Sequence, residues 1–177
     1  MATGYPTIIR AYEPAHVERA IDIYRSAIHT TAAPFYTRAQ LEAWAPQKAD
    51  ATKWNERLLE FKTFFAERNG ALTAFISWEM NGHIAMLFTH PDFARQGFAR
   101  SLYRCAEFAF LEAGLTRAFA EASLAARPFF ARCGFEVEHE EEVECRNEQL
   151  RRFVMRKPLV PFKSDCTLFD HTGDLTP

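Results

Sequence analysis

Two Asn-Gly dipeptides constrain the fold of this chain more than any other feature. Asn69-Gly70 and Asn81-Gly82 separate three short runs rich in β-branched and aromatic residues, at 63–67, 71–79 and 84–89. Asn-Gly favours the tight turns of β-hairpins, because these two residues tolerate the positive φ angles that such turns require. The sequence therefore predicts an antiparallel meander of three strands in the middle of the chain.

A strand and three helices are expected before the meander. Residues 7–12 alternate as a strand does, and apolar residues from 17 to 28 recur at helical spacing. Two shorter helices are expected at 37–44 and 50–59, which begin with Thr and Asp, two residues that commonly cap helices.

Strands and helices alternate again after the meander. A helix is predicted at 97–113, a strand at 116–123 and a short helix at 125–132, followed by two strands at 138–146 and 150–157. This order predicts an α/β fold with a mixed, mostly antiparallel sheet of about seven strands, flanked by helices.

Length and composition favour one domain. A chain of 177 residues with 17 Phe can bury one sizeable core but is too short for two ordinary domains. We expect a domain at 1–159 and an arm or disordered tail at 160–177. No run of eighteen apolar residues occurs and the first residues lack the order of a signal peptide, so we expect a cytoplasmic protein without a membrane partner.

Charge and cysteine spacing exclude several classes of function. The net charge of -2 leaves no excess of basic residues to bind a nucleic acid, so none is expected as a partner. The four cysteines have no Cys-x-x-Cys spacing and no paired histidines nearby, which argues against a disulfide framework and against a metal site. A homodimer stays open at this stage.

One loop has the features of an anion site. Residues 93–100 place Gly97 and Ala99 among arginines at the predicted start of a helix. A helix N-terminus offers unpaired N–H groups and the positive end of the helix dipole, and both bind phosphate oxygens. The alternative is that Gly97 only permits a tight turn before an ordinary helix.

A second motif lies further along the chain, Arg127-Pro128-Phe129-Phe130-Ala131-Arg132-Cys133-Gly134-Phe135. Together with the strand at 84–89 and the loop containing Gly97, it resembles the GNAT superfamily of N-acetyltransferases over about residues 7–159. The resemblance implies a sheet splayed between its fourth and fifth strands. It also implies transfer of an acetyl group from acetyl-CoA to an unidentified primary amine, by direct attack on the thioester. The alternative is an acyl-CoA-binding or sensing module with weak or no catalysis.

The resemblance also implies where acetyl-CoA binds, with the pantetheine arm along the fourth strand and the pyrophosphate at the helix start. The implied cofactor-binding residues are Leu87, Phe88, Thr89, Arg95, Gln96, Gly97, Phe98, Ala99, Arg100, Ser123 and Phe130. The family often has Asn at the position of Ser123 and Tyr at that of Phe130. The usual general acid is therefore missing from this sequence.

Catalysis also needs a group that deprotonates the acceptor, because an alkyl amine of pKa ~10.4 is uncharged only about once in 2,500 molecules at pH 7. Glu79 and Glu121, on the third strand and on the strand leading to Ser123, are the candidate bases. Each is also interpretable as a solvated carboxylate or an ion-pair partner. His83 and His90 are predicted to be turn residues.

The acceptor site is expected between the first helices and the last strands. Its candidate residues are His29, Tyr36, Trp44 and Cys145, and packing is the alternative role for the two aromatic rings and the thiol. The glutamates of 138–144 are expected to form a solvated face, or else an acidic surface that attracts a cationic amine.

Overall fold

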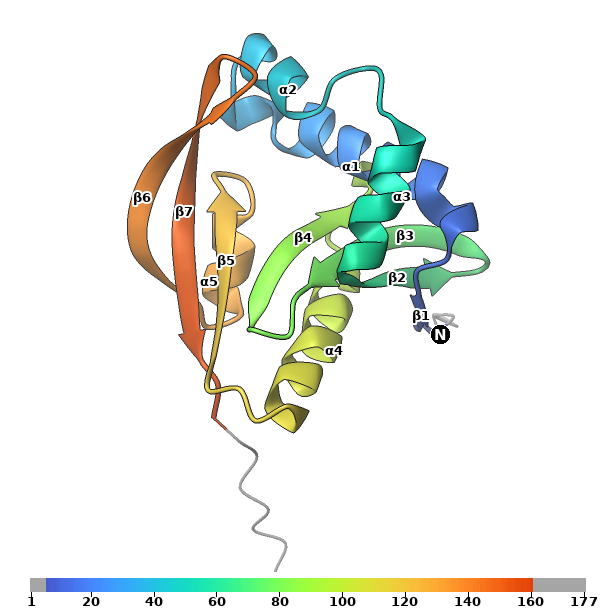
Figure 1. The fold of residues 1–177 in the computed structure, drawn as a ribbon, viewed down its shortest axis with the longest axis vertical. Coiled ribbons are helices and arrows are strands. Elements are labelled where there is room, and N and C mark those ends of the chain that lie inside the picture. Colours follow the sequence, from blue (N-terminus) through green and yellow to red (C-terminus); the bar gives the residue numbers. More distant parts are fainter. Residues whose placement is uncertain (1–5, 161–177) are drawn as a thin grey trace, which may run out of the picture.

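A seven-stranded sheet organises the protein in a computed structural model that describes residues 6–160 (Figure 1). The strand order is β1-β2-β3-β4-β5-β7-β6, and every neighbouring pair is antiparallel except β4 and β5. The strands are β1 (Ile8–Ala11), β2 (Lys62–Arg68), β3 (Ala71–Trp78), β4 (His83–Thr89), β5 (Arg117–Ser123), β6 (Glu136–Cys145) and β7 (Glu148–Pro158). The predicted α/β class and mixed sheet are confirmed.

Helices cover both faces of the sheet. They are α1 (Val17–Ser26), α2 (Arg38–Trp44), α3 (Ala51–Glu60), α4 (Phe98–Glu112) and α5 (Arg127–Arg132). Short 3-10 turns lie at Pro14–His16, Ala33–Phe35 and Pro91–Phe93, and a π turn at Ala27–Thr31 extends α1. Helix α4 packs on β2, β3 and β4, whereas α1 and α3 contact the same strands on the opposite face.

The expected helix caps are present. The Thr37 hydroxyl accepts a hydrogen bond from the Gln40 amide, and the Gln40 side chain accepts one from the Thr37 amide. The Asp50 carboxylate accepts hydrogen bonds from the Thr52 and Lys53 amides. These bonds satisfy donors that the first turn of a helix leaves unpaired, so the two helices begin where the sequence predicts.

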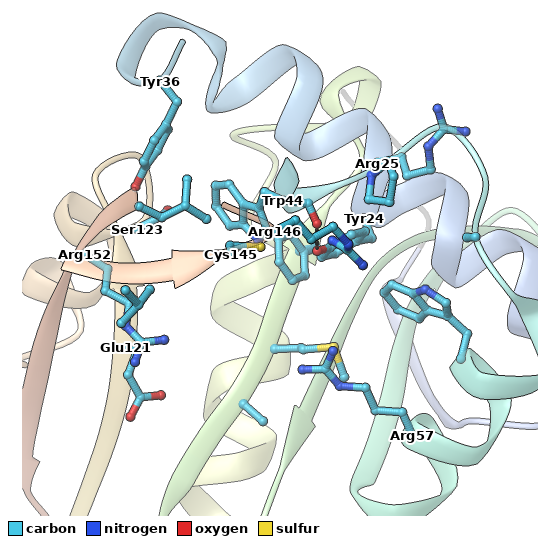
Figure 2. A pocket seen from close by; sticks show the side chains of 18 of the residues that line it. Tyr24, Arg25, Tyr36, Trp44, Arg57, Glu121, Ser123, Cys145, Arg146 and Arg152 are labelled. Atoms are coloured by element: carbon cyan, nitrogen blue, oxygen red, sulfur yellow. Dashed lines mark hydrogen bonds between the residues drawn. The ribbon is translucent and has the colours of Figure 1, made fainter. Parts of the chain in front are cut away.

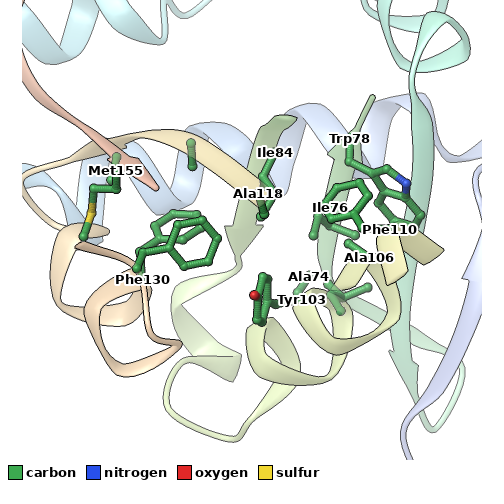
Figure 3. Packing of buried hydrophobic residues seen from close by; sticks show 14 of the residues in the cluster. Ala74, Ile76, Trp78, Ile84, Tyr103, Ala106, Phe110, Ala118, Phe130 and Met155 are labelled. Atoms are coloured by element: carbon green, nitrogen blue, oxygen red, sulfur yellow. The ribbon is translucent and has the colours of Figure 1, made fainter. Parts of the chain in front are cut away.

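The main core lies between α4 and the sheet (Figure 3). Tyr103, Ala106 and Phe110 of α4 are almost completely buried against strand residues such as Ile76. The apolar side of α4 is therefore centred on these residues, while Cys105 of the same helix is only partly buried.

The two Asn-Gly turns differ from one another. Asn69 and Gly70, with φ angles of 53° and 76°, form the whole connection between β2 and β3. The second turn is longer and spans 79–82, and there the Asn81 side chain accepts a hydrogen bond from the His83 amide. A Cβ on Gly82 would lie 2.4 Å from the carbonyl oxygen of Arg117, so Gly82 permits the close approach of β5.

The register of the sheet breaks at Ala85. Trp78 on β3 pairs with Ile84 on β4, and the residue before it, Ser77, pairs with Met86. Ala85 is therefore an extra residue on β4. Such a β-bulge bends its strand and leaves the extra residue unpaired. On the other side, β5 pairs only with His83 and Ile84. Strand β4 thus leaves β5 from Ala85 onward, which confirms the splay expected between the fourth and fifth strands.

The bulge also exchanges the faces of the side chains that follow it. Ile84 packs in the core beneath α4, whereas Met86 packs with α1 and α3 on the opposite face. In a regular strand these two residues would share a face, because side chains alternate with a period of two.

The end of the domain is well packed. Leu159 is buried and its amide donates a hydrogen bond to the Thr116 carbonyl. Apart from Val160, the arm or tail expected at 160–177 lies outside the described residues, and the boundary at 159 stays a prediction. Across residues 6–160, every helix is too short or too polar to cross a membrane.

Candidate active site

A cavity of about 760 Å³ opens beside the splay, on the face that carries α1 and α3 (Figure 2). Ala85, Met86 and Phe88 of β4 line it, together with Glu121 and Ser123 of β5. Residues of the first three helices and of β6 and β7 complete its wall. Its volume lies within the range of small-molecule sites, roughly 300–1,000 Å³.

One side of the cavity is aromatic. The Tyr24 ring lies 4.8 Å from the Trp54 ring and 4.9 Å from the Phe88 ring, between centroids. Its hydroxyl donates a hydrogen bond of 2.8 Å to the Trp44 carbonyl. Burial raises the pKa of Tyr24 to about 12, so this hydroxyl stays neutral. Sequence reasoning missed Tyr24 as a site residue, because its position on the apolar side of α1 is equally typical of a core residue.

Three of the four predicted acceptor residues line the cavity, namely Tyr36, Trp44 and Cys145. The Tyr36 hydroxyl donates to the Arg151 carbonyl at 2.7 Å and accepts from the Leu124 amide at 3.0 Å. These bonds fasten the segment before α2 to the ends of β5 and β7.

The fourth predicted acceptor residue, His29, lies outside the cavity lining. Its Nε2 is 2.7 Å from the Ala45 carbonyl oxygen, so the side chain connects the π turn to the end of α2. Tertiary contacts therefore give His29 a structural partner that the sequence did not reveal.

The two candidate bases are joined by a histidine. His83 Nδ1 lies 2.6 Å from Glu79 Oε2, and His83 Nε2 lies 2.7 Å from Glu121 Oε2. The imidazole stacks on Phe119 with a centroid distance of 4.8 Å. Of the three polar residues only Glu121 lines the cavity. The Glu79 side chain is the more exposed carboxylate, at 43% against 27% for Glu121.

This arrangement shifts the pKa values of its members. The hydrogen bond that His83 donates to Glu121 raises the pKa of His83, with a smaller contribution from Glu79, and these effects outweigh the opposing effect of burial. The hydrogen bond with His83 in turn lowers the pKa of Glu121. The sequence interpretation of His83 as only a turn residue was incomplete, because its contact with Glu121 depends on the pairing of β4 with β5.

A smaller groove of about 250 Å³ lies on the opposite face of the sheet, at the start of α4. Its lining residues are Thr89, Phe93, Arg95, Gly97, Phe98, Ala99, Arg100, Phe129, Arg132 and Cys133. Gly97 is the N-cap of α4 with a φ of 89°, and Arg95 also has a positive φ, of 62°. The first N–H groups of α4 have no partner within the helix, so the groove combines free donors with three arginine side chains.

The groove contains six of the predicted cofactor residues: Thr89, Arg95, Gly97, Phe98, Ala99 and Arg100. Gln96 lies in the same loop, but its side chain contacts Arg68 at 3.0 Å and the Asp92 carbonyl at 3.3 Å. Leu87 packs against the core beneath α4. Phe88 and Ser123 line the large cavity instead.

Phe130 lies in the core rather than in the groove. Its side chain is 4% exposed, and its ring packs 5.4 Å from the Phe129 ring and 5.1 Å from the Phe135 ring. The neighbouring Phe129 lines the groove, together with Cys133 one helical turn later. Sequence reasoning missed these two residues, because the rotation of a six-residue helix cannot be read from its own short pattern.

Three glutamates of β6 form ion pairs with arginines of β7. Ion pairs join Glu138 to Arg156, Glu140 to Arg151, and Glu141 to Arg152. The strand face is solvated, as one interpretation expected, but these pairs cancel much of its negative charge. Within residues 6–160, no three His, Cys, Asp or Glu side chains gather in an arrangement that could hold a metal.

The fold thus combines a mixed α/β sheet that opens between two parallel strands with an anion-type groove on one face and a ligand-sized cavity on the other. Comparison with known proteins specifies the family. The sequence profile described as "Acetyltransferase (GNAT) domain" matches residues 32–159. The chain therefore belongs to the GNAT family and is an N-acetyltransferase.

Individual relatives agree with this assignment. The chain is 34% identical over 148 residues to the uncharacterized N-acetyltransferase YafP of Escherichia coli K12, covering 84% of this chain and 93% of the relative. A GCN5-related N-acetyltransferase from Rhodopseudomonas palustris has a similar structure, with a TM-score of 0.85 and 28% identity. The match covers 90% of this chain and 99% of that protein. The PaiA N-acetyltransferase from Thermoplasma acidophilum, solved with coenzyme A, has a TM-score of 0.70 and 18% identity. This match covers 86% of this chain and 99% of that protein.

Proposed function

We propose that this protein transfers the acetyl group of acetyl-CoA to a primary amine by direct attack of the amine on the thioester. The observation that carries the proposal is the stretch of β4 that does not pair with β5, which begins at Ala85 and has a hollow on each face of the sheet. Ala85 lines the large cavity, and Thr89 lines the groove at the start of α4. One strand thus links an anion site to a small-molecule site.

The groove residues suit the phosphates of acetyl-CoA. No heavy atom lies within 4 Å of where a Cβ on Gly97 would stand, so a ligand can approach the backbone there. Arg95, Arg100 and Arg132 line the groove without any carboxylate in its wall. The PaiA N-acetyltransferase, which has a similar fold, was solved with coenzyme A, and this supports a coenzyme A ligand for the present protein. Beyond Ala85, the β4 backbone has no pairing with β5 and can hydrogen-bond the pantetheine arm.

The cavity residues suit the amine. Acetyl-CoA supplies an activated acetyl group, whose carbonyl carbon bonds to the amine nitrogen as its bond to sulfur breaks. Backbone N–H groups left unpaired around the Ala85 bulge are placed to stabilise the charge that develops on the carbonyl oxygen. If the departing thiol resembles Cys, with a pKa of ~8.5, its thiolate lies only about 2 kcal/mol uphill at pH 7.

Glu121 is the group that accepts the proton of the amine. It lines the cavity, whereas Glu79 reaches it only through His83. The three side chains form a hydrogen-bonded path from the cavity to the more exposed Glu79 carboxylate. A proton taken by Glu121 can pass to His83 and from there to solvent, so each turnover restores the base.

The chemistry is tested by following thiol release from acetyl-CoA with a panel of primary amines. Acceptor-dependent release, with the acetylated amine identified by mass spectrometry, is the expected outcome. Saturable binding of acetyl-CoA without thiol release from any amine would instead favour an acyl-CoA-binding or sensing module.

Adding a hydroxyl at Phe130 tests whether the missing tyrosine matters. Because the Phe130 ring is buried among Phe129 and Phe135, we expect Phe130→Tyr to leave acetyl-CoA affinity and kcat nearly unchanged. The buried hydroxyl should instead lower the free energy of unfolding by about 1–3 kcal/mol. Calorimetric binding, thiol release and urea unfolding measure the three quantities.

Phe129→Tyr is the matched control, because this ring lines the groove. A new hydroxyl there points into the groove and not into the core, so it should leave the free energy of unfolding nearly unchanged. A large increase in kcat for Phe130→Tyr, with none for Phe129→Tyr, would contradict the placement of the two rings.

A further inference from the structure

The large cavity carries positive charge that no carboxylate neutralises. Within residues 6–160, neither Arg57 nor Arg146 forms an ion pair with an acidic side chain, although both line the cavity. The two carboxylates of the cavity wall have other partners. Asp50 caps α3, and Glu121 hydrogen-bonds His83. The cavity therefore presents uncompensated guanidinium groups to whatever enters it.

These two guanidinium groups come from different elements of the cavity wall. Arg57 extends from α3 and Arg146 from the turn between β6 and β7, and Figure 2 draws both among the side chains that line the cavity, with Arg146 next to Tyr24. Burial raises the pKa of Tyr24, and the positive charges of Arg57 and Arg146 oppose that rise, which indicates that both act on the same hydroxyl. The aromatic wall and the two cations thus border the same part of the cavity.

The backbone of Arg146 is in an unfavourable conformation. Arg146 and Asn147 form the two-residue turn between β6 and β7, with φ angles of 47° and 69°. Asn, Asp or Gly normally occupy both positions of such a turn, because longer side chains are strained at positive φ. The Arg146 side chain donates to the Ala43 carbonyl near the end of α2, and this leaves further guanidinium donors for the cavity. A strained residue that directs a cation into a cavity points to a ligand role.

We infer that the amine acceptor also carries an anionic group, a carboxylate or a phosphate, which Arg57 and Arg146 bind. The inference rests on the proposed acetyl transfer. The amine then lies next to Glu121 and Ser123, the apolar body of the acceptor packs against Tyr24 and its aromatic neighbours, and the anion neutralises the two guanidinium groups. Guanidinium groups bind carboxylate and phosphate strongly because they offer parallel N–H donors in a plane. An acceptor that is only cationic would be repelled by the same charges.

Matched acceptors provide the test. Aminomethylbenzoate and aminomethylphenyl phosphate carry an amine and an anion on one ring, whereas the methyl ester of aminomethylbenzoate keeps the shape without the charge. Binding of the three compounds is measured by calorimetry in the presence of coenzyme A, and thiol release from acetyl-CoA gives kcat/KM. We expect at least one anionic compound to bind and react at least about 10-fold better than the ester, the effect of one charged hydrogen bond.

Two variants assign this preference to the arginines. Arg57→Gln removes a charge from an exposed side chain of α3, and Arg146→Asn places in the turn a residue that tolerates its positive φ, so both should fold. Each variant should bind the anionic compound about 10-fold more weakly than the wild type and should bind the ester with unchanged affinity. Arg104→Gln, at an exposed position of α4, makes the same change in net charge away from the cavity. It should leave the affinity for both kinds of compound unchanged.

The outcomes separate the inference from the proposed function. The inference would be overturned if the ester and both anionic compounds bound equally well, or if neither anionic compound bound. It would also be overturned if the Arg57→Gln and Arg146→Asn variants lost affinity for the ester and for the anionic compounds equally. In each of those cases, thiol release with the ester would still support acetyl transfer to an amine. A preference between carboxylate and phosphate identifies which anion the natural acceptor carries.

Discussion

Replacement of Glu121 by Gln is expected to lower kcat/KM for the amine by about 10²- to 10⁴-fold at neutral pH, the range of general base catalysis. Gln has nearly the same shape and can still accept a hydrogen bond from His83, but it cannot take a proton from the amine. Acetyl-CoA affinity should be unchanged, because Glu121 lines the cavity and not the groove at α4. Thiol release under subsaturating amine and calorimetry with acetyl-CoA measure the two effects.

The pH profile distinguishes a proton path from a structural effect. The pKa of Glu121 is lowered by His83, so this carboxylate is ionised throughout the neutral range. The pKa of His83 is raised above its ordinary value of 6.5 by Glu121 and Glu79. The neutral imidazole that can relay a proton therefore accumulates only as the pH rises through that raised pKa. We expect kcat/KM of the wild type to increase over this range and the Glu121→Gln variant to lose that increase.

Glu79→Gln is the matched control for this prediction. Glu79 also hydrogen-bonds His83, but it does not line the cavity. Removing its charge should lower the pKa of His83, so the rise in kcat/KM should move to lower pH while the plateau is largely kept. If both Gln variants keep the wild-type profile with a competent amine, neither glutamate is the base and solvent or another group takes the proton.

Gly97→Asp is expected to abolish acetyl-CoA binding, which means a loss of at least roughly 10²-fold, or about 3 kcal/mol. The side chain would occupy the open space at the start of α4 that the phosphates are proposed to fill. Its carboxylate would repel the phosphates and compete for the same free N–H groups. Calorimetry with acetyl-CoA measures the loss, and the unfolding midpoint in urea checks that the variant is folded.

Gly114→Asp provides the corresponding control at the other end of the same helix. Gly114 follows α4, has a φ of 74°, and likewise has no heavy atom within 4 Å of a Cβ position. The substitution therefore adds the same charge and a similar backbone strain, far from the groove. If Gly97→Asp binds acetyl-CoA as tightly as the wild type, the assignment of the phosphate loop is wrong. If Gly114→Asp loses as much acetyl-CoA affinity as Gly97→Asp, the loss is an effect on folding.

Local signals in the sequence determined the elements of this fold. The helix caps at Thr37 and Asp50, the two-residue turn at Asn69 and Gly70, and the small residue at the start of α4 were all predictable. Each depends on hydrogen bonds or φ angles within a few residues, so neighbours along the chain contain the necessary information. The order of these elements, together with the two motifs, also identified the family.

The arrangement of the candidate site was decided by tertiary structure. The bulge at Ala85 follows from the register between β3 and β4, and the contact of His83 with Glu121 follows from the short parallel pairing with β5. The same holds for Phe130, whose burial depends on how α5 packs on the sheet.

The charge of the cavity likewise became visible only in three dimensions. Arg57 and Arg146 are 89 positions apart in the chain, and the sequence gives no sign that both face one cavity. The glutamates of β6 suggested an acidic surface, but cross-strand pairing with β7 neutralises three of them. Charges act through space and not along the chain. The sequence therefore determined which ionic groups the protein has, and the folded structure decided which of them remain uncompensated beside the proposed acceptor.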